Sequence, residues 1–146
     1  MKYDRKVRLC KMFGHAVAGY LANNMELRNS VCLVPVPLHA RRLQERGYNQ
    51  SLLLARAIAG KLDNTTLYEN VLARTRYTLP QAKMNREERL RNVRNAFVVQ
   101  NKQVLKDRVV ALVDDVMTTG STLNECARVV RQAGAKDVFS LTIARA

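Results

Sequence analysis

Residues 108–122 constrain the fold of this chain more than any other stretch. They begin with a continuous apolar run of β-branched character, Arg108-Val109-Val110-Ala111-Leu112-Val113. Such a run is typical of a strand that is covered on both faces in a parallel sheet. Two aspartates, Asp114 and Asp115, are expected to end the strand, and a polar loop then leads into an apolar-striped stretch, 121–132. The segment therefore predicts a strand–loop–helix unit of an α/β protein.

The other apolar stretches alternate between helical and strand patterns. Helices are predicted over 4–25, from Gln50 or Ser51 to 62, and over 85–93, where Asn85 and Glu88 form a capping box. Strands are predicted over 31–37, 67–73, 96–99 and 138–143, and a polar loop over 38–49. We expect one domain over 1–146, built as an open, mainly parallel, twisted α/β sheet flanked by helices.

The loop after the two aspartates has the chemistry of a phosphate site. Four of its five residues carry hydroxyl groups, and the fifth is a glycine that lets the backbone curve around an anion: Thr118, Thr119, Gly120, Ser121 and Thr122. The N-terminus of the following helix favours a phosphate at the same place. A carboxylate would repel that phosphate, so the expected partners of Asp114 and Asp115 are vicinal ribose hydroxyls, which donate hydrogen bonds.

Other phosphate-binding motifs are absent from the sequence. There is no G-x-x-x-x-G-K-[ST] of a P-loop and no G-x-G-x-x-G of a dinucleotide fold. Cys10, Cys32 and Cys126 form no C-x-x-C pair, so no zinc ribbon is encoded, and they are expected to be buried. No apolar run approaches the ~20 residues of a membrane helix. We therefore expect a cytoplasmic protein without membrane insertion.

The net charge of +13 suits a polyanionic partner, which is a pyrophosphate, a nucleotide or a nucleic acid backbone. The charge is uneven along the chain. Residues 1–50 carry nine Lys and Arg against three Asp and Glu, and residues 51–108 carry twelve against five, whereas 109–146 carry four of each. A basic body thus precedes a neutral C-terminal part.

Residues 109–123 resemble the binding motif for phosphoribosyl pyrophosphate (PRPP) of type I phosphoribosyltransferases: a hydrophobic strand, two acids, two hydrophobic residues and T-T-G-S-T. The resemblance implies that Asp114 and Asp115 meet the ribose 2- and 3-hydroxyls. It also implies that the loop, with Val116 and Met117 at its start, cradles the 5-phosphate.

The wider chain resembles the ComF (competence protein F, GntX-like) family. The matching segments are Val34-Pro35-Val36-Pro37-Leu38-His39, Arg46-Gly47-Tyr48-Asn49-Gln50-Ser51, and the pattern of Arg74-Thr75, Gln81, Arg89, Asn92 and Ala96-Phe97. Members of that family usually carry an N-terminal four-cysteine zinc ribbon, which this sequence lacks. The resemblance implies Mg²⁺-dependent phosphoribosyl transfer, with the ion held mainly through PRPP and not by a dedicated protein site.

The pyrophosphate is expected to contact polar and basic residues of two segments. Those candidates are Arg42, Arg46, Gly47, Asn49, Gln50, Lys83 and Arg89, the last two on a hood formed by residues 74–92. Asp114, Asp115 and Arg46 are the catalytic candidates. Thr118 stands where hypoxanthine/guanine enzymes have an aspartate, and a threonine cannot act as a carboxylate base. The acceptor of the phosphoribosyl group therefore stays open.

Two functions remain open from the sequence. The first is a phosphoribosyltransferase, and the second is a non-catalytic protein that responds to PRPP or a nucleotide or binds DNA, for example with the competence machinery. The position of the arginines discriminates between them: arginines that converge on residues 114–122 serve pyrophosphate, whereas a stripe elsewhere favours nucleic acid. A homodimer is also left open.

Overall fold

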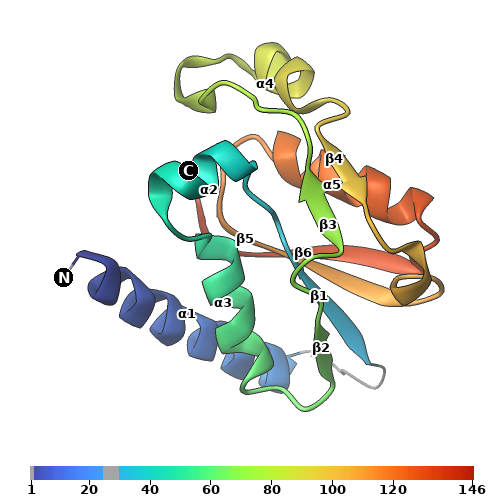
Figure 1. Cartoon of the computed structure of the whole chain (residues 1–146). Helices are drawn as coiled ribbons and strands as arrows, with labels where there is room; N and C mark the ends of the chain where they lie inside the picture. Colours follow the sequence, from blue (N-terminus) through green and yellow to red (C-terminus); the bar gives the residue numbers. More distant parts are fainter. Residues whose placement is uncertain (1, 25–29) are drawn as a thin grey trace.

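The computed structural model describes residues 2–24 and 30–146 and contains two sheets (Figure 1). A parallel sheet has the strand order β2-β1-β5-β6, with β1 at Val31–Pro35, β2 at Thr65–Leu67, β5 at Val109–Met117 and β6 at Asp137–Arg145. A small antiparallel sheet pairs β3 (Leu72–Arg74) with β4 (Phe97–Val99). The helices are α1 (Lys2–Asn24), α2 (Ala40–Arg46), α3 (Gln50–Ala59), α4 (Arg86–Val93) and α5 (Ser121–Gln132).

The central strands are covered on both faces, as their apolar pattern predicts. In β1, Val31 and Leu33 belong to the cluster that α1 and α3 complete through Leu21, Leu54 and Ile58. The alternate residues, Cys32 and Val34, join a second cluster with side chains of α5 and the small sheet. The parallel α/β fold and the burial of all three cysteines are therefore confirmed.

At Gly14, α1 packs closely against α3. A Cβ atom at Gly14 would lie 2.4 Å from the Cβ of Ala57 in α3, whereas a Cβ at Gly19, also in α1, would meet no atom within 4 Å. We expect Gly14→Ala to lower the free energy of unfolding by roughly 1–3 kcal/mol because the helices must separate. Gly19→Ala is the matched control and should raise it by about 0.5–1 kcal/mol through helix propensity. Urea unfolding of both variants measures the difference, and a stabilised Gly14→Ala would contradict this packing.

Three predicted elements differ in the structure. The predicted strand 67–73 is two strands in different sheets, because β2 pairs with β1 while β3 pairs with β4. The predicted loop 38–49 contains α2, which is capped by His39 and ends at Gly47 with φ of 84°. The strand expected to end at Val113 continues through both aspartates, because β6 is long enough to pair with it as far as Met117.

The remaining predictions agree closely with the structure. Helix α5 has the predicted bounds, α4 has the predicted capping box at Asn85, and Gly134 lies just after α5 with φ of 99°. The predicted N-terminal helix is present as α1, and its expected end at Met25 lies outside the described residues. Two short 3-10 turns, Gln81–Lys83 and Lys102–Val104, were not predicted.

Candidate functional site

Two adjoining cavities open at the carboxyl ends of β1 and β5. Both are lined by Arg46, Asp114, Asp115 and Thr122. The first, of ≈ 200 Å³, extends toward α2 and the segment after β3, and the second, of ≈ 390 Å³, extends along the loop before α5. A ligand is expected at this edge of an open α/β sheet, and the second volume is within the range of small-molecule sites.

Asp114 is held by the first turn of a helix that is 63 residues away in sequence. Its Oδ1 accepts hydrogen bonds from Ser51 Oγ at 2.8 Å and from the Asp115 backbone N–H at 2.9 Å. Burial raises the pKa of Asp114 from 3.8 to about 7, and the negative charge of Asp115 adds to this, while the Ser51 hydrogen bond opposes it. Near neutral pH the carboxyl group is therefore present in both its protonated and its ionised form.

The raised pKa of Asp114 predicts a pH-dependent stability. Between about pH 4 and 7 the folded chain keeps the proton that the unfolded chain releases, so the free energy of unfolding falls as pH rises through this window. We expect Asp114→Asn to raise Tm by several degrees at pH 8 and to flatten this pH dependence. Asp63→Asn, at an exposed position outside the cavity, should keep the wild-type profile. Thermal melts from pH 5 to 8 test this, and an unchanged slope in Asp114→Asn would exclude the assignment.

The loop before α5 presents donors to the second cavity. Gly120 has φ of 80° and occupies the N-cap position, with no side chain bonded to the helix N-terminus. Thr118, Ser121 and Thr122 line the cavity, together with Val116 and Met117. Thr119 does not line it, but its Oγ1 is 2.7 Å from Ser121 Oγ and orients that hydroxyl. The free N–H groups and the helix dipole favour a phosphate here.

Four of the basic side chains of 39–50 and 74–94 converge on the two aspartates. Arg42, Arg46 and Arg74 line the first cavity, and Arg46 and Arg89 line the second. The Arg46 guanidinium donates to Gln50 Oε1 at 3.1 Å, so these two predicted pyrophosphate residues lie together. The arginines thus converge on the two aspartates, which is the arrangement expected of a pyrophosphate site and not of a nucleic acid stripe.

Three other predicted pyrophosphate residues are placed differently. Gly47 lines neither of the two cavities, and its positive φ serves to end α2. Asn49 lines the first cavity, but its amide caps α3 by accepting from Ser51 N–H and donates to the Val36 carbonyl. Lys83 is exposed and lines neither cavity. Their contacts with a ligand stay predictions.

Arg74 belongs to the site but was not among the predicted site residues. It ends β3, lines the first cavity and donates to the hydroxyl of the buried Thr78, while its Cζ is 5.2 Å from the centre of the Phe97 ring. Burial lowers its pKa, and the nearby Arg42 and Arg76 lower it further. The sequence does contain a signal for this residue, since Arg74 is an arginine at a strand end. The incorrectly predicted strand 67–73 hid that position.

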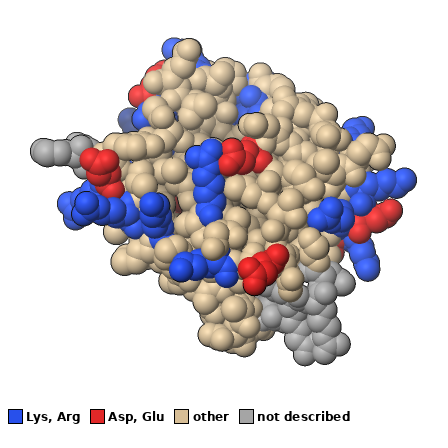
Figure 2. Space-filling model, turned by 60° about the horizontal axis from the view of Figure 1, so that its bottom comes forward, with Lys and Arg blue, Asp and Glu red and all other residues tan. Residues whose placement is uncertain are grey.

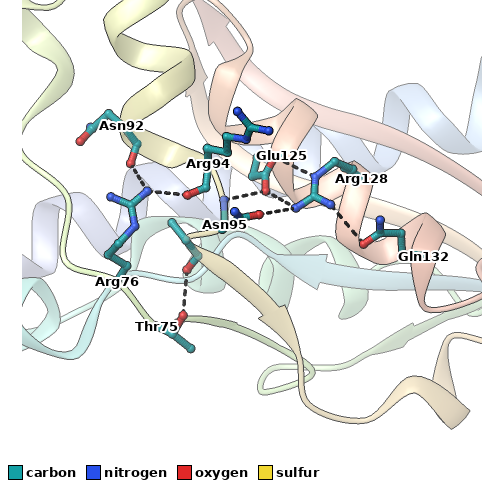
Figure 3. A network of polar contacts seen from close by, with 9 residues as sticks. Thr75, Arg76, Asn92, Arg94, Asn95, Glu125, Arg128 and Gln132 are labelled. Atoms are coloured by element: carbon teal, nitrogen blue, oxygen red, sulfur yellow. Dashed lines mark hydrogen bonds and ion pairs between the residues drawn. The ribbon is translucent and has the colours of Figure 1, made fainter.

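The predicted hood, residues 74–92, is attached at its base (Figure 3). Arg76 donates to the carbonyls of Asn92 and Arg94 at 2.8 and 2.5 Å. At the end of the segment, Glu125 of α5 accepts from the Asn95 backbone N–H at 3.0 Å and pairs with Arg128 at 2.6 Å. These contacts hold the hood beside α5, whose first residues belong to the loop of residues 118–122, called the phosphate loop below.

Basic side chains do not form a continuous stripe on the face shown in Figure 2. They lie in separate groups with acidic side chains beside them. Among the described residues, no helix is long and apolar enough to cross a membrane. On this face the charge pattern agrees with local anion binding better than with a long nucleic acid track.

Comparison with known proteins agrees with the fold. Residues 49–146 match the family model "Phosphoribosyl transferase domain". Over 122 residues the chain is 38% identical to competence protein F of Haemophilus influenzae, covering 83% of this chain and 53% of that protein. It is 38% identical to the DNA utilization protein YhgH of Escherichia coli, covering 73% of this chain and 45% of that protein. The chain thus spans about half the length of these curated relatives.

A solved structure supports the fold independently. Phosphoribosylpyrophosphate synthetase from Mycobacterium smegmatis superposes with a TM-score of 0.56 at 18% identity, over 90% of this chain and 33% of that one. At this identity the likeness concerns the fold alone. The family match and the curated relatives together confirm the resemblance inferred from the sequence. The chain therefore belongs to the phosphoribosyl transferase domain family and is similar, within it, to competence proteins of the ComF type.

Proposed function

We propose that the chain binds PRPP and transfers its phosphoribosyl group to an acceptor whose identity stays open. The observation that carries this proposal is the convergence of Asp114, Asp115 and the phosphate loop with Arg42 and Arg46 around two adjoining cavities. Carboxylates suit the ribose hydroxyls, the loop suits the 5-phosphate and the arginines suit the pyrophosphate.

The chemistry assigns a separate task to each part of the site. The bond between ribose C1 and the pyrophosphate oxygen breaks, its electron pair leaves with the pyrophosphate, and an acceptor attacks C1 from the opposite face. Arg42 and Arg46 stabilise the negative charge that grows on the leaving group. Ser51 keeps Asp114 directed at the ribose through its 2.8 Å hydrogen bond. The hood, which carries Arg89, excludes water from the cavity when it is closed.

We expect a Mg²⁺ ion to be held at this site mainly by the bound PRPP. The described residues place no third Asp, Glu, His or Cys beside Asp114 and Asp115 to complete a protein cage. Mg²⁺ commonly takes most of its ligands from substrate phosphates and water. When bound with PRPP, the ion would neutralise charge on the pyrophosphate, while the two carboxylates supply hard oxygen atoms nearby.

The test is the stability of the chain with PRPP and Mg²⁺. At a PRPP concentration 100 times the dissociation constant, binding stabilises the folded state by about 2.7 kcal/mol, so we expect a clear rise in Tm. Ribose 5-phosphate should give a smaller rise, and glucose 6-phosphate none. An unchanged Tm at millimolar PRPP would refute the ligand assignment.

A role with DNA is the second candidate. It is supported by the net charge of +13 and by relatives whose names refer to competence and DNA utilization. Outside the two cavities, Arg41 and Arg91 are exposed and pair with Glu45 and Glu87 at 3.5 and 3.8 Å. Such surface pairs are weak, so DNA phosphates can replace the carboxylates. The candidate requires that binding of single-stranded DNA weaken steeply with salt and persist in variants that no longer bind PRPP.

A further inference from the structure

His39 is a cavity residue to which the function proposed above gives no task. It is half-buried, and it lines the first cavity together with Arg42, Arg46 and the two aspartates. The other histidine of the chain, His15, is in α1 and does not line that cavity. A neutral imidazole has one nitrogen that donates a hydrogen bond and one that accepts, so the tautomer of His39 decides what it offers to a ligand.

The start of α2 fixes this tautomer. The backbone N–H of Arg41 donates to His39 Nδ1 at 3.2 Å, which makes His39 the N-cap residue of α2. A ring nitrogen that accepts a hydrogen bond carries no proton, so the proton of the neutral ring is on Nε2. Because the two nitrogens lie on different edges of the ring, Nε2 points away from the α2 backbone.

Nε2 of His39 is a donor that a ligand can reach. Among the residues that the structure describes, it has no hydrogen-bond partner. It is not one of the fully buried polar atoms without a partner, which are Tyr48 Oη and Arg74 Nε. The first cavity therefore contains an accessible N–H group that is available for an acceptor.

The plane of the His39 ring is held by the hood. Tyr77, a hood residue, packs against it with ring centroids 5.4 Å apart and ring planes at 71°. Arg41 lies over the same tyrosine, with its Cζ 4.6 Å from the ring centroid. Edge-to-face aromatic pairs of this kind are favourable. The hydrogen bond at Nδ1 and the contact with Tyr77 together restrict the ring, so its N–H is oriented before a ligand arrives.

The charges around the first cavity indicate the acceptor. Arg42, Arg46 and Arg74 line it as well, and three cations suit a ligand with several negative charges. The phosphate loop, which suits the 5-phosphate, contributes most of its residues to the second cavity, and His39 does not line that cavity. The pyrophosphate is the part of PRPP that remains for the first cavity.

We propose that His39 is a further catalytic residue, whose Nε2–H donates a hydrogen bond to a non-bridging oxygen of the pyrophosphate. This hydrogen bond strengthens as the bond from ribose C1 to the pyrophosphate oxygen breaks, because the electron pair of that bond moves onto the pyrophosphate. The ring keeps its proton throughout. The inference rests on the proposed function, since it takes pyrophosphate as the anion of the first cavity.

His39→Asn keeps the cap and removes the donor. The asparagine oxygen takes the place of Nδ1, and asparagine is a preferred N-cap residue, so Tm without ligand should not fall. We expect calorimetry with inorganic pyrophosphate and Mg²⁺ to show an affinity that is lower by roughly tenfold or more. The affinity for ribose 5-phosphate should stay nearly unchanged. His15→Asn replaces the other histidine and is the matched control, with both affinities as in the wild-type chain.

His39→Gln is the converse variant. Its amide N–H reaches about as far as Nε2, but it has no acceptor at the position of Nδ1. We expect it to keep the pyrophosphate affinity within about threefold of the wild-type value. Loss of the cap should lower its Tm by about 2–4 °C. Binding and stability should therefore change separately in the two variants.

Three results would overturn the role of His39. They are full pyrophosphate affinity in His39→Asn, an equal loss of ribose 5-phosphate affinity in that variant, and a loss in His39→Gln as large as in His39→Asn. The second would place His39 at the 5-phosphate, and the third would make the cap the cause of the loss. All three leave the Tm shift of the wild-type chain with PRPP intact. A wild-type chain that does not respond to PRPP would instead refute the proposed function, and this role with it.

Discussion

The double variant Asp114→Asn with Asp115→Asn should lose the Tm shift that PRPP and Mg²⁺ produce in the wild-type chain. Both carboxylates line both cavities of the site, and each amide replaces one accepting oxygen by a donor that opposes a ribose hydroxyl. Charged hydrogen bonds contribute about 1.5–3 kcal/mol each. Losing two of them weakens binding by a factor of roughly 10² to 10⁴, which removes the shift at millimolar PRPP.

The controls separate lost binding from lost folding. Burial of an ionised Asp114 is unfavourable, so the double variant should be at least as stable as the wild-type chain at pH 8 without ligand. Asp63→Asn changes an exposed acidic residue that lies outside both cavities and should keep the shift. A double variant that is well folded and still responds fully to PRPP would show that the carboxylates do not contact the ribose.

Arg46→Ala should weaken PRPP binding by roughly one to two orders of magnitude and leave ribose 5-phosphate binding nearly unchanged. Arg46, the last residue of α2, lines both cavities together with the aspartates, and its hydrogen-bond partner among the described residues is the neutral Gln50. Its charge is therefore available for the pyrophosphate, which ribose 5-phosphate lacks. The expected loss follows from one charge-assisted contact of about 1.5–3 kcal/mol.

Titration calorimetry with the two ligands measures this difference directly. Arg91→Ala is the matched control, since it also removes one positive charge but from an exposed position in α4 that pairs with Glu87. It should lower both affinities only slightly, because a distant charge contributes little to the screened electrostatic potential at the site. An equal loss for both ligands in Arg46→Ala would place this arginine at the 5-phosphate and not at the pyrophosphate.

The strand–loop–helix unit could be predicted because its signals are local. The β-branched run marks a buried strand, and the hydroxyl-rich loop with Gly120 marks the start of α5. The capping box of α4 is equally local. Helix α2 was missed because its sequence, A-R-R-L-Q-E-R, contains good helix formers but a single large apolar residue and thus no apolar period.

The remaining features depend on contacts between distant segments. The split of 67–73 into two strands follows from partners at Val31–Leu33 and Phe97–Val99. The hydrogen bond from Ser51 to Asp114 joins the start of α3 to β5, and the role of Arg74 depends on cavities built from several elements. Spacing along the chain contains no such information until the order of the strands is known.

The attachment of the hood at both ends has a consequence for protein engineering. Arg76 joins the two ends of the segment, and Glu125 with Arg128 fixes Asn95 to α5, so the interior between them is held as a cassette. Residues 79–91 can therefore be exchanged for the corresponding segment of a relative while these junctions are kept. A set of such chimeras would change the segment that covers the cavity without altering the aspartates or the phosphate loop. It would offer a direct way to identify the acceptor.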